Sequence, residues 1–102
     1  MTRLLDDEEI ERQLGDLPDW TRDGDTIRAS YEAPEFLAGI ALVQEVAAAA
    51  ETMDHHPDID IRWRTVSFAL STHSEGGLTQ LDIELAHQIS QEAVRRGARS
   101  AG

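Results

Sequence analysis

The chain has 102 residues, no cysteine and a formal net charge of −11. This length supports one domain with a single hydrophobic core and excludes a separate substrate domain. Without cysteine the chain cannot form disulfides, thiolate nucleophiles or thiolate metal sites. Its negative charge repels phosphate backbones, which need clustered lysine and arginine, so we expect no direct binding of nucleic acid.

The sequence predicts neither a signal peptide nor a membrane span. Residues 1–9 carry charges where a signal peptide needs an apolar run, and we read no apolar stretch as approaching the roughly 18 to 20 residues of a membrane span. We therefore expect a cytoplasmic protein without membrane contact.

Arg95, Arg96 and Arg99 suit the C-terminus of a helix, whose dipole favours cations. Residues 97–102 are expected to form a disordered tail after a single domain at residues 1–96.

A short helix is predicted near the start of the chain. Asp6 can cap it, and Glu9 stands three residues later, at capping-box spacing. Ile10 and Leu14 supply a short apolar stripe, and the helix is expected to end near Gly15.

A hairpin is predicted next. Pro18 and the Asp-Gly-Asp turn at residues 23–25 bracket a short segment around Trp20. Residues 26–32 then alternate, with one apolar face formed by Ile27, Ala29 and Tyr31.

A long central helix is predicted from Pro34, which suits a first helical turn, to about Met53. Apolar residues recur through it at helical spacing, at Phe36, Ile40, Val43, Ala47 and Ala50. The four alanines at residues 47–50 allow either tight packing on the sheet of the same chain or the close approach of a second helix. We expect the first arrangement.

After Pro57 the apolar period changes to two, which predicts two strands that each bury one face. The apolar positions are Ile59, Ile61 and Trp63 in the first strand and Val66, Phe68 and Leu70 in the second. Trp63 is therefore expected in the core or in the wall of a pocket.

The glycine pair at residues 76–77 ends this pattern, and a last helix follows. Thr79 is its predicted cap, and Asp82 occupies the third helical position of a capping box. One side of this helix is apolar, formed by Leu81, Leu85, Ile89 and Ala93.

The element order is thus helix, strand, strand, helix, strand, strand, helix. It contains no obligatory parallel crossover, and hairpins with one apolar face need amphipathic helices to cover them. We predict an α+β two-layer domain with a four-stranded, mainly antiparallel sheet and three helices on one face.

The main candidate for a functional site is a spaced set of titratable residues. It contains three of the four histidines and two carboxylates, in the pattern Glu51-x3-His55-His56-Pro57-x5-Trp63-x9-His73-x8-Asp82. The histidines fall at element ends or in loops, where scaffolds present functional groups. Imidazole exchanges protons near neutral pH, so the set favours general acid and base chemistry.

Each of these residues also has a purely structural interpretation. The histidine pair can be a solvated helix end, Asp82 can serve only as a cap, and Glu51 can be an ordinary exposed residue. His87 is assigned no chemistry. Adjacent histidines lack the spacing that aims two rings at one metal ion, and Ser71 and Ser74 lie in no nucleophile elbow, so neither a metal site nor nucleophilic catalysis is predicted.

The spaced pattern closely resembles the pterin-4a-carbinolamine dehydratase family. Two further segments carry the resemblance, Ser71-Thr72-His73 and Gly76-Gly77-Leu78-Thr79-x-x-Asp82, and it runs from about Leu17 to Ile89. The family has a four-stranded antiparallel sheet with three helices on one face, in the element order predicted above.

The resemblance implies a dehydratase that removes water from 4a-hydroxytetrahydropterin and forms the quinonoid dihydropterin. It implies no cofactor and no metal, a small pterin as substrate, and a homodimer or homotetramer. The alternative is a binding protein of the same fold, which acts as a dimerisation or assembly cofactor. Three intact histidines favour the enzyme.

The resemblance also implies roles for individual residues. His55, His56 and His73 correspond to the catalytic histidines, with His56 and His73 acting around the 4a-hydroxyl and His55 accepting a proton. Glu51 and Asp82 would orient or charge a histidine, and Trp63 would lie near them. The walls that hold the pterin are the segments Asp54-His55-His56 and Ser71-Thr72-His73-Ser74.

Overall fold

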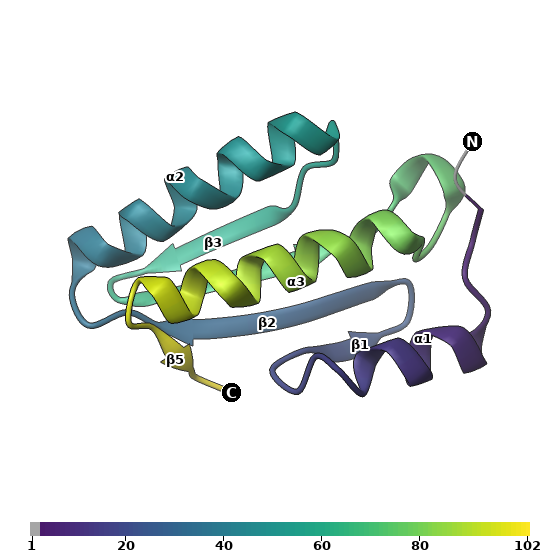
Figure 1. Cartoon of the computed structure of the whole chain (residues 1–102), viewed down its shortest axis with the longest axis horizontal. Helices are drawn as coiled ribbons and strands as arrows, with labels where there is room; N and C mark the ends of the chain where they lie inside the picture. Colours follow the sequence, from purple (N-terminus) through teal and green to yellow (C-terminus); the bar gives the residue numbers. More distant parts are fainter. Residues whose placement is uncertain (1–2) are drawn as a thin grey trace.

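The computed structural model describes residues 3–102 and shows an α+β arrangement (Figure 1). The predicted order of three helices and four strands is confirmed, with one short 3-10 helix and one short strand added. In chain order the elements are α1 (Asp7–Leu14), β1 (Thr21–Asp23), β2 (Thr26–Glu32), α2 (Phe36–Met53), β3 (Asp58–Arg62), β4 (Thr65–Leu70), η1 (His73–Glu75), α3 (Gln80–Arg95) and β5 (Arg99–Ser100).

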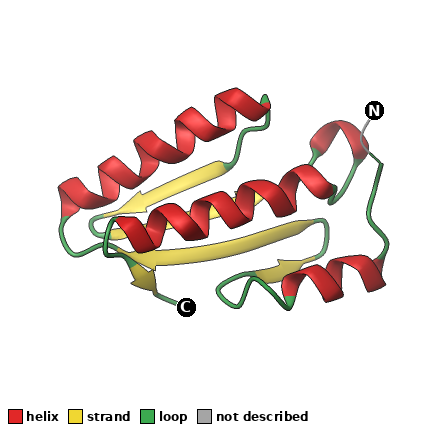
Figure 2. Ribbon diagram, viewed as in Figure 1, coloured by secondary structure: helices red, strands yellow, loops and turns green. Residues whose placement is uncertain are grey.

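The strands form one antiparallel sheet in the order β1-β2-β4-β3, so the two longest strands lie in the middle. Ala29 of β2 pairs with Phe68 of β4, which in turn pairs with Ile59 of β3. β5 pairs with the end of β2, beyond β1. Figure 2 shows this strand at the C-terminus. The expected disordered tail at residues 97–102 is therefore wrong, because Ala101 N–H also donates to the carbonyl of Ser30 at 2.9 Å.

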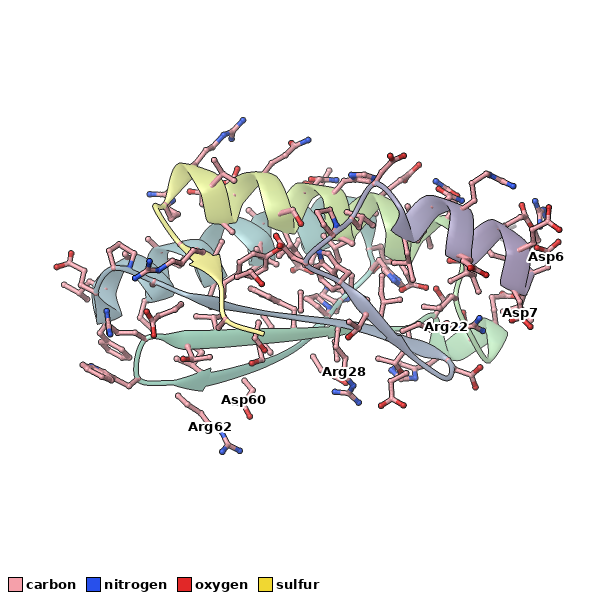
Figure 3. The ribbon with its side chains drawn as sticks, turned by 90° about the horizontal axis from the view of Figure 1, so that it is seen from below. Asp6, Asp7, Arg22, Arg28, Asp60 and Arg62 are labelled. Atoms are coloured by element: carbon pink, nitrogen blue, oxygen red, sulfur yellow. The ribbon has the colours of Figure 1, made fainter. Side chains whose placement is uncertain are left out.

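All three helices cover the same face of the sheet, which confirms the two-layer prediction. Seen edge-on, the helices lie above the sheet, and Arg28, Asp60 and Arg62 project from the opposite face (Figure 3). Between the layers the inner faces of β2 and β4 are fully buried, as their alternation predicted. The side chains that form this inner face are Ile27, Ala29, Tyr31, Val66, Phe68 and Leu70.

The buried face of α2 differs from the predicted stripe. The helix begins at Phe36, two residues after Pro34, and Phe36 itself is 47% exposed. The buried residues of the helix are Gly39, Leu42, Val46 and Ala50, so that Ala50 alone of the predicted stripe is fully buried, and Val43 packs against the core partly buried. At Gly39 the helix approaches β4 so closely that an added Cβ would lie 3.3 Å from Val66 Cγ2. A glycine at this position therefore permits the close approach of α2 to β4.

The other side of α2 is also apolar. The helix has 18 residues and a mean hydropathy of 1.4, enough by length and composition to cross a membrane. The expectation that no apolar stretch reaches this length is therefore wrong. Since one face of α2 lies in the protein core, the second apolar face is surplus to the folding of a single chain.

β3 and the turn that follows it also differ from expectation. Every residue of β3 is exposed, and β3 is an edge strand of the sheet. Trp63, in the turn between β3 and β4, is 73% exposed, has a φ of 53° and stacks under the guanidinium of Arg64. The prediction that Trp63 lies in the core or in a pocket wall is wrong.

A partly buried hydrogen-bond cluster joins the loop before β1 to α3. Trp20 Nε1–H donates to Ser90 Oγ at 2.9 Å, and the Tyr31 hydroxyl donates to Asp19 Oδ2 at 3.1 Å. The Ser90 and Tyr31 hydroxyls lie 2.9 Å apart. Burial raises the pKa of Tyr31 to about 12.

Alkaline pH should therefore weaken the fold through Tyr31. An unfolded tyrosine loses its proton near pH 10, whereas the folded protein holds it to about pH 12. The unfolded state then binds fewer protons, so stability falls as the pH rises between these two values. Tyr31 is the only tyrosine, so ultraviolet absorbance of tyrosinate reports it alone. A midpoint near pH 10 in the folded protein would contradict this prediction.

Candidate active site

The end of α2 turns His55 toward the interior. Asp54, the residue after the helix, has a left-handed conformation with φ 50° and ψ 45°. His55 N–H donates back to the carbonyl of Ala50 at 3.0 Å, which is the long bond of a Schellman ending. Aspartate tolerates this conformation better than most residues. The chain therefore reverses sharply, with His55 buried and His56 exposed.

His55 forms a buried pair with Asp82. Its Nε2 lies 2.6 Å from Asp82 Oδ1, although the two residues are 27 positions apart in the sequence. His55 is 8% exposed and Asp82 is 0% exposed. A carboxylate taken out of water needs hydrogen-bond donors around it, and the imidazole supplies one of them.

Two further donors reach the other oxygen of Asp82. Thr79 N–H donates to Oδ2 at 2.9 Å, and the Thr72 hydroxyl donates to the same oxygen at 2.8 Å. The Thr79 bond belongs to the predicted capping box at the start of α3, which is confirmed. Asp82 thus performs two tasks at once, because the carboxylate that caps α3 also holds the ring of His55.

His56 forms a second pair with a carboxylate, on the surface. Its Nε2 lies 2.5 Å from Glu51 Oε2, and the side chains are 56% and 76% exposed. Because Glu51 lies in the last turn of α2, the helix end carries both pairs. Solvent reaches the His56 ring and can exchange protons with it.

His73 lies at the start of η1, just after Thr72. It is exposed, and its ring makes no hydrogen bond with the described residues 3–102. The segment is closed by a bridge between Thr72 and Gly77, where Thr72 N–H donates to the Gly77 carbonyl at 2.9 Å. Gly76, with a φ of 75°, makes the turn possible.

The structure therefore brings together most of the predicted site residues. The Asp82 contacts hold the segment Asp54-His55-His56 against the segment Ser71-Thr72-His73-Ser74. Trp63 does not join them, because it lies at the opposite end of β4 from Ser71. The contact of the Thr79 hydroxyl with the site was not predicted, since the sequence indicates only that Thr79 caps the last helix.

The geometry suits proton transfer. His55 is a buried imidazole that a carboxylate orients, and the neighbouring His56 is an exposed imidazole paired with another carboxylate. The site therefore contains two rings in different environments. Among residues 3–102, no group of three or more histidine, aspartate or glutamate side chains is placed to hold a metal ion.

The family model described as "Pterin 4 alpha carbinolamine dehydratase" matches residues 3–92, which include every residue of this site. The chain belongs to that family. A relative in Nocardia farcinica, provisionally named a pterin-4-alpha-carbinolamine dehydratase, is 63% identical over 92 residues, covering 90% of this chain and 97% of the relative. A relative in Mycobacteroides abscessus with the same provisional name is 53% identical, covering 90% and 98%.

Solved structures agree with membership in the pterin carbinolamine dehydratase family. A protein of Brucella melitensis, described as a transcriptional coactivator/pterin dehydratase, superposes with a TM-score of 0.84 at 31% identity, covering 89% of this chain and 98% of that one. A pterin dehydratase-like protein described as a RuBisCO assembly factor in the alpha-carboxysome superposes with a TM-score of 0.60 at 16% identity, covering 72% and 86%. The second likeness concerns the fold alone.

Proposed function

We propose that this protein is a hydro-lyase that removes water from a 4a-hydroxytetrahydropterin and forms the quinonoid dihydropterin. The buried pair of His55 and Asp82 carries the proposal, because a purely structural helix end has no need of a buried imidazole held by a carboxylate. Family membership supplies the class of substrate.

The reaction needs two proton transfers. The bond between C4a and the hydroxyl oxygen breaks, the oxygen takes a proton and leaves as water, and ring nitrogen N5 loses its proton as the C4a–N5 double bond forms. Hydroxide is a poor leaving group, so an acid at the oxygen and a base near N5 lower the barrier. These transfers require neither a metal nor a redox cofactor.

His55 is the proposed proton acceptor. Its Nε2 is hydrogen-bonded to Asp82 Oδ1, and the other oxygen, Oδ2, accepts from two further donors. The Asp82 carboxylate acts as an acceptor throughout, so the proton of the Nε2–Oδ1 bond lies on Nε2. The lone pair of a neutral ring then lies on Nδ1. A carboxylate on one ring nitrogen stabilises the imidazolium that forms when the other nitrogen accepts a proton.

His56 and His73 are proposed to act around the 4a-hydroxyl. Both rings are exposed, as a group that donates to a departing water must be, and Glu51 can balance the charge of protonated His56. Asp54, Ser71 and Ser74 would then complete the walls around the pterin. We place the reaction in the cytoplasm, whose reducing conditions suit a chain without cysteine.

The experiment that tests this function is a direct rate measurement. A 4a-hydroxytetrahydropterin is generated in situ, and the appearance of the quinonoid product is followed with and without the protein, from about pH 6 to about pH 8.5. Acceleration above the uncatalysed rate is the expected result. No acceleration by a folded protein would refute the enzyme and favour the alternative, a binding or assembly role for the same fold.

The same proposal includes a homodimer or homotetramer. The outer face of α2 exposes Phe36 and Leu37, the latter at 71%, and exposed apolar surface of this kind marks association sites. On the same side of the molecule as α2 (Figure 1), β3 ends the sheet and pairs with β4 along one side, with no strand among residues 3–102 on its other side. A second copy of the chain would cover such surfaces by symmetry.

Leu37→Glu should therefore reduce the size of the assembly. The charge would be placed in an apolar contact, which disfavours association by several kcal/mol in the manner of a buried unpaired charge. Light scattering after size-exclusion chromatography gives the mass. Gln91→Glu adds the same charge on α3 and should leave the mass unchanged. A parent protein that runs as a monomer at every concentration would contradict the proposal.

A further inference from the structure

Thr72 lies next to the site without being open to it. The residue is 5% exposed, and it directly precedes His73. Its hydroxyl has one proton, which it donates to Asp82 Oδ2 at 2.8 Å. The Thr79 hydroxyl lies 2.8 Å from the same Thr72 oxygen. Since the Thr72 proton is already used, Thr79 must be the donor in that contact.

These assignments define a chain of hydrogen bonds with a single direction. Leu81 N–H donates to the Thr79 hydroxyl at 3.3 Å, Thr79 donates to Thr72, and Thr72 donates to Asp82. Asp82 then accepts the ring proton of His55 through its other oxygen. Thr72, Thr79 and Asp82 are all buried, so water cannot replace a missing member.

We propose that Thr72 is a positioning residue, which fixes the carboxylate of Asp82 and through it the orientation and tautomer of His55. The resemblance to the family implied that Thr72 lies in the wall that holds the pterin. Its hydroxyl has no proton left for a substrate, and its oxygen already accepts from Thr79. The inference rests on the proposed dehydratase only for its kinetic consequence.

The physical reason is that a carboxylate held by one oxygen can rotate. Oδ2 has two donors, and the Thr79 N–H comes from the helix start, whereas the Thr72 hydroxyl comes from the segment that carries His73. Removing the hydroxyl leaves Oδ2 tied to α3 alone. The His55 ring then loses its fixed partner, and the His73 segment loses its side-chain link to the His55 side of the site. Misplacement of a reacting group by about 1 Å can lower the rate about 100-fold.

Thr72→Val is the test, because valine keeps the shape of threonine and lacks the hydroxyl. We expect kcat to fall about 10- to 100-fold while KM changes less than about threefold, since the hydroxyl does not touch substrate. Thr72→Ser restores the hydroxyl and should recover most of kcat. Ser67→Ala is the matched control, because it removes a hydroxyl pair with Ser30, 2.7 Å apart, on the open face of the sheet.

A second readout needs no substrate. In nuclear magnetic resonance of protein with labelled histidine, the Nε2 proton of His55 should exchange slowly with water, because it lies in a buried bond to Asp82. The exposed His56 ring should not show such a proton. Thr72→Val should broaden or abolish the His55 signal, and Thr72→Ser should retain it.

Each outcome decides the inference. A Thr72→Val protein that keeps both kcat and the protected His55 proton would refute it, and so would a change confined to KM, which would return Thr72 to the substrate wall. If Thr72→Val does not fold, the Thr72→Ser and parent spectra decide, because absence of a protected His55 proton in both would overturn the proposal. If the parent protein has no dehydratase activity but gives the expected spectra, the proposed function is refuted, whereas the positioning role of Thr72 still holds.

Discussion

Asp82→Ala is expected to lower the free energy of unfolding by about 3 to 5 kcal/mol, because each buried donor that loses its acceptor costs about 1 to 3 kcal/mol and the helix also loses a cap. The substitution leaves the largely buried His55 ring and Thr72 hydroxyl without their acceptor. It also removes the capping box of α3. Denaturation by urea, followed by circular dichroism, measures the loss.

Glu51→Ala provides the comparison for that result. It removes the carboxylate of the other histidine pair, whose two side chains are more than half exposed. Exposed ion pairs contribute about 1 kcal/mol or less, so the unfolding free energy should change little. Equal losses for the two variants would mean that the Asp82 pair is not buried in solution as it is in the structure.

His56→Ala is expected to lower kcat by about 100- to 10,000-fold, the range of a single positioned acid or base. Because His56 is exposed and its one side-chain bond to the described residues 3–102 is with exposed Glu51, stability should change by less than about 0.5 kcal/mol. The rate of pterin dehydration and the urea midpoint are measured on the same preparation. A lower rate at unchanged stability separates chemistry from folding.

His87→Ala is the matched control for this substitution. His87 is a partly buried histidine on α3, outside the segments that carry the site. Its loss should leave the rate of dehydration unchanged. If His56→Ala keeps the parental rate, His56 is removed from the mechanism, and proton donation at the 4a-hydroxyl falls to His73 alone.

Features that depend on neighbouring residues were predictable from the sequence. Both capping boxes follow from partners three positions apart, Asp6 with Glu9 and Thr79 with Asp82. The turn at Gly24 and the alternation of β2 and β4 likewise need only local information. The spacing of the histidines and carboxylates was also sufficient to indicate the family.

Features that depend on residues distant in the sequence could not be predicted from it. α2 is apolar on both sides, so periodicity alone could not choose between Phe36 and Gly39 as the face that meets β4. The exposure of Trp63 follows from the position of β3 at the edge of the sheet, which is a property of strand order. β5 is a strand only because the end of β2 offers it unpaired backbone groups.

By itself, the sequence determined the elements, their caps and the set of titratable residues, because each of these follows from spacing along one chain. Only the tertiary structure decided that His55 and His56, which are adjacent in the sequence, differ in burial and in their carboxylate partner. The left-handed Asp54 turns one ring inward to Asp82 and leaves the other in solvent with Glu51. Burial and hydrogen bonding are set by what packs around a residue, and a linear pattern does not contain that information.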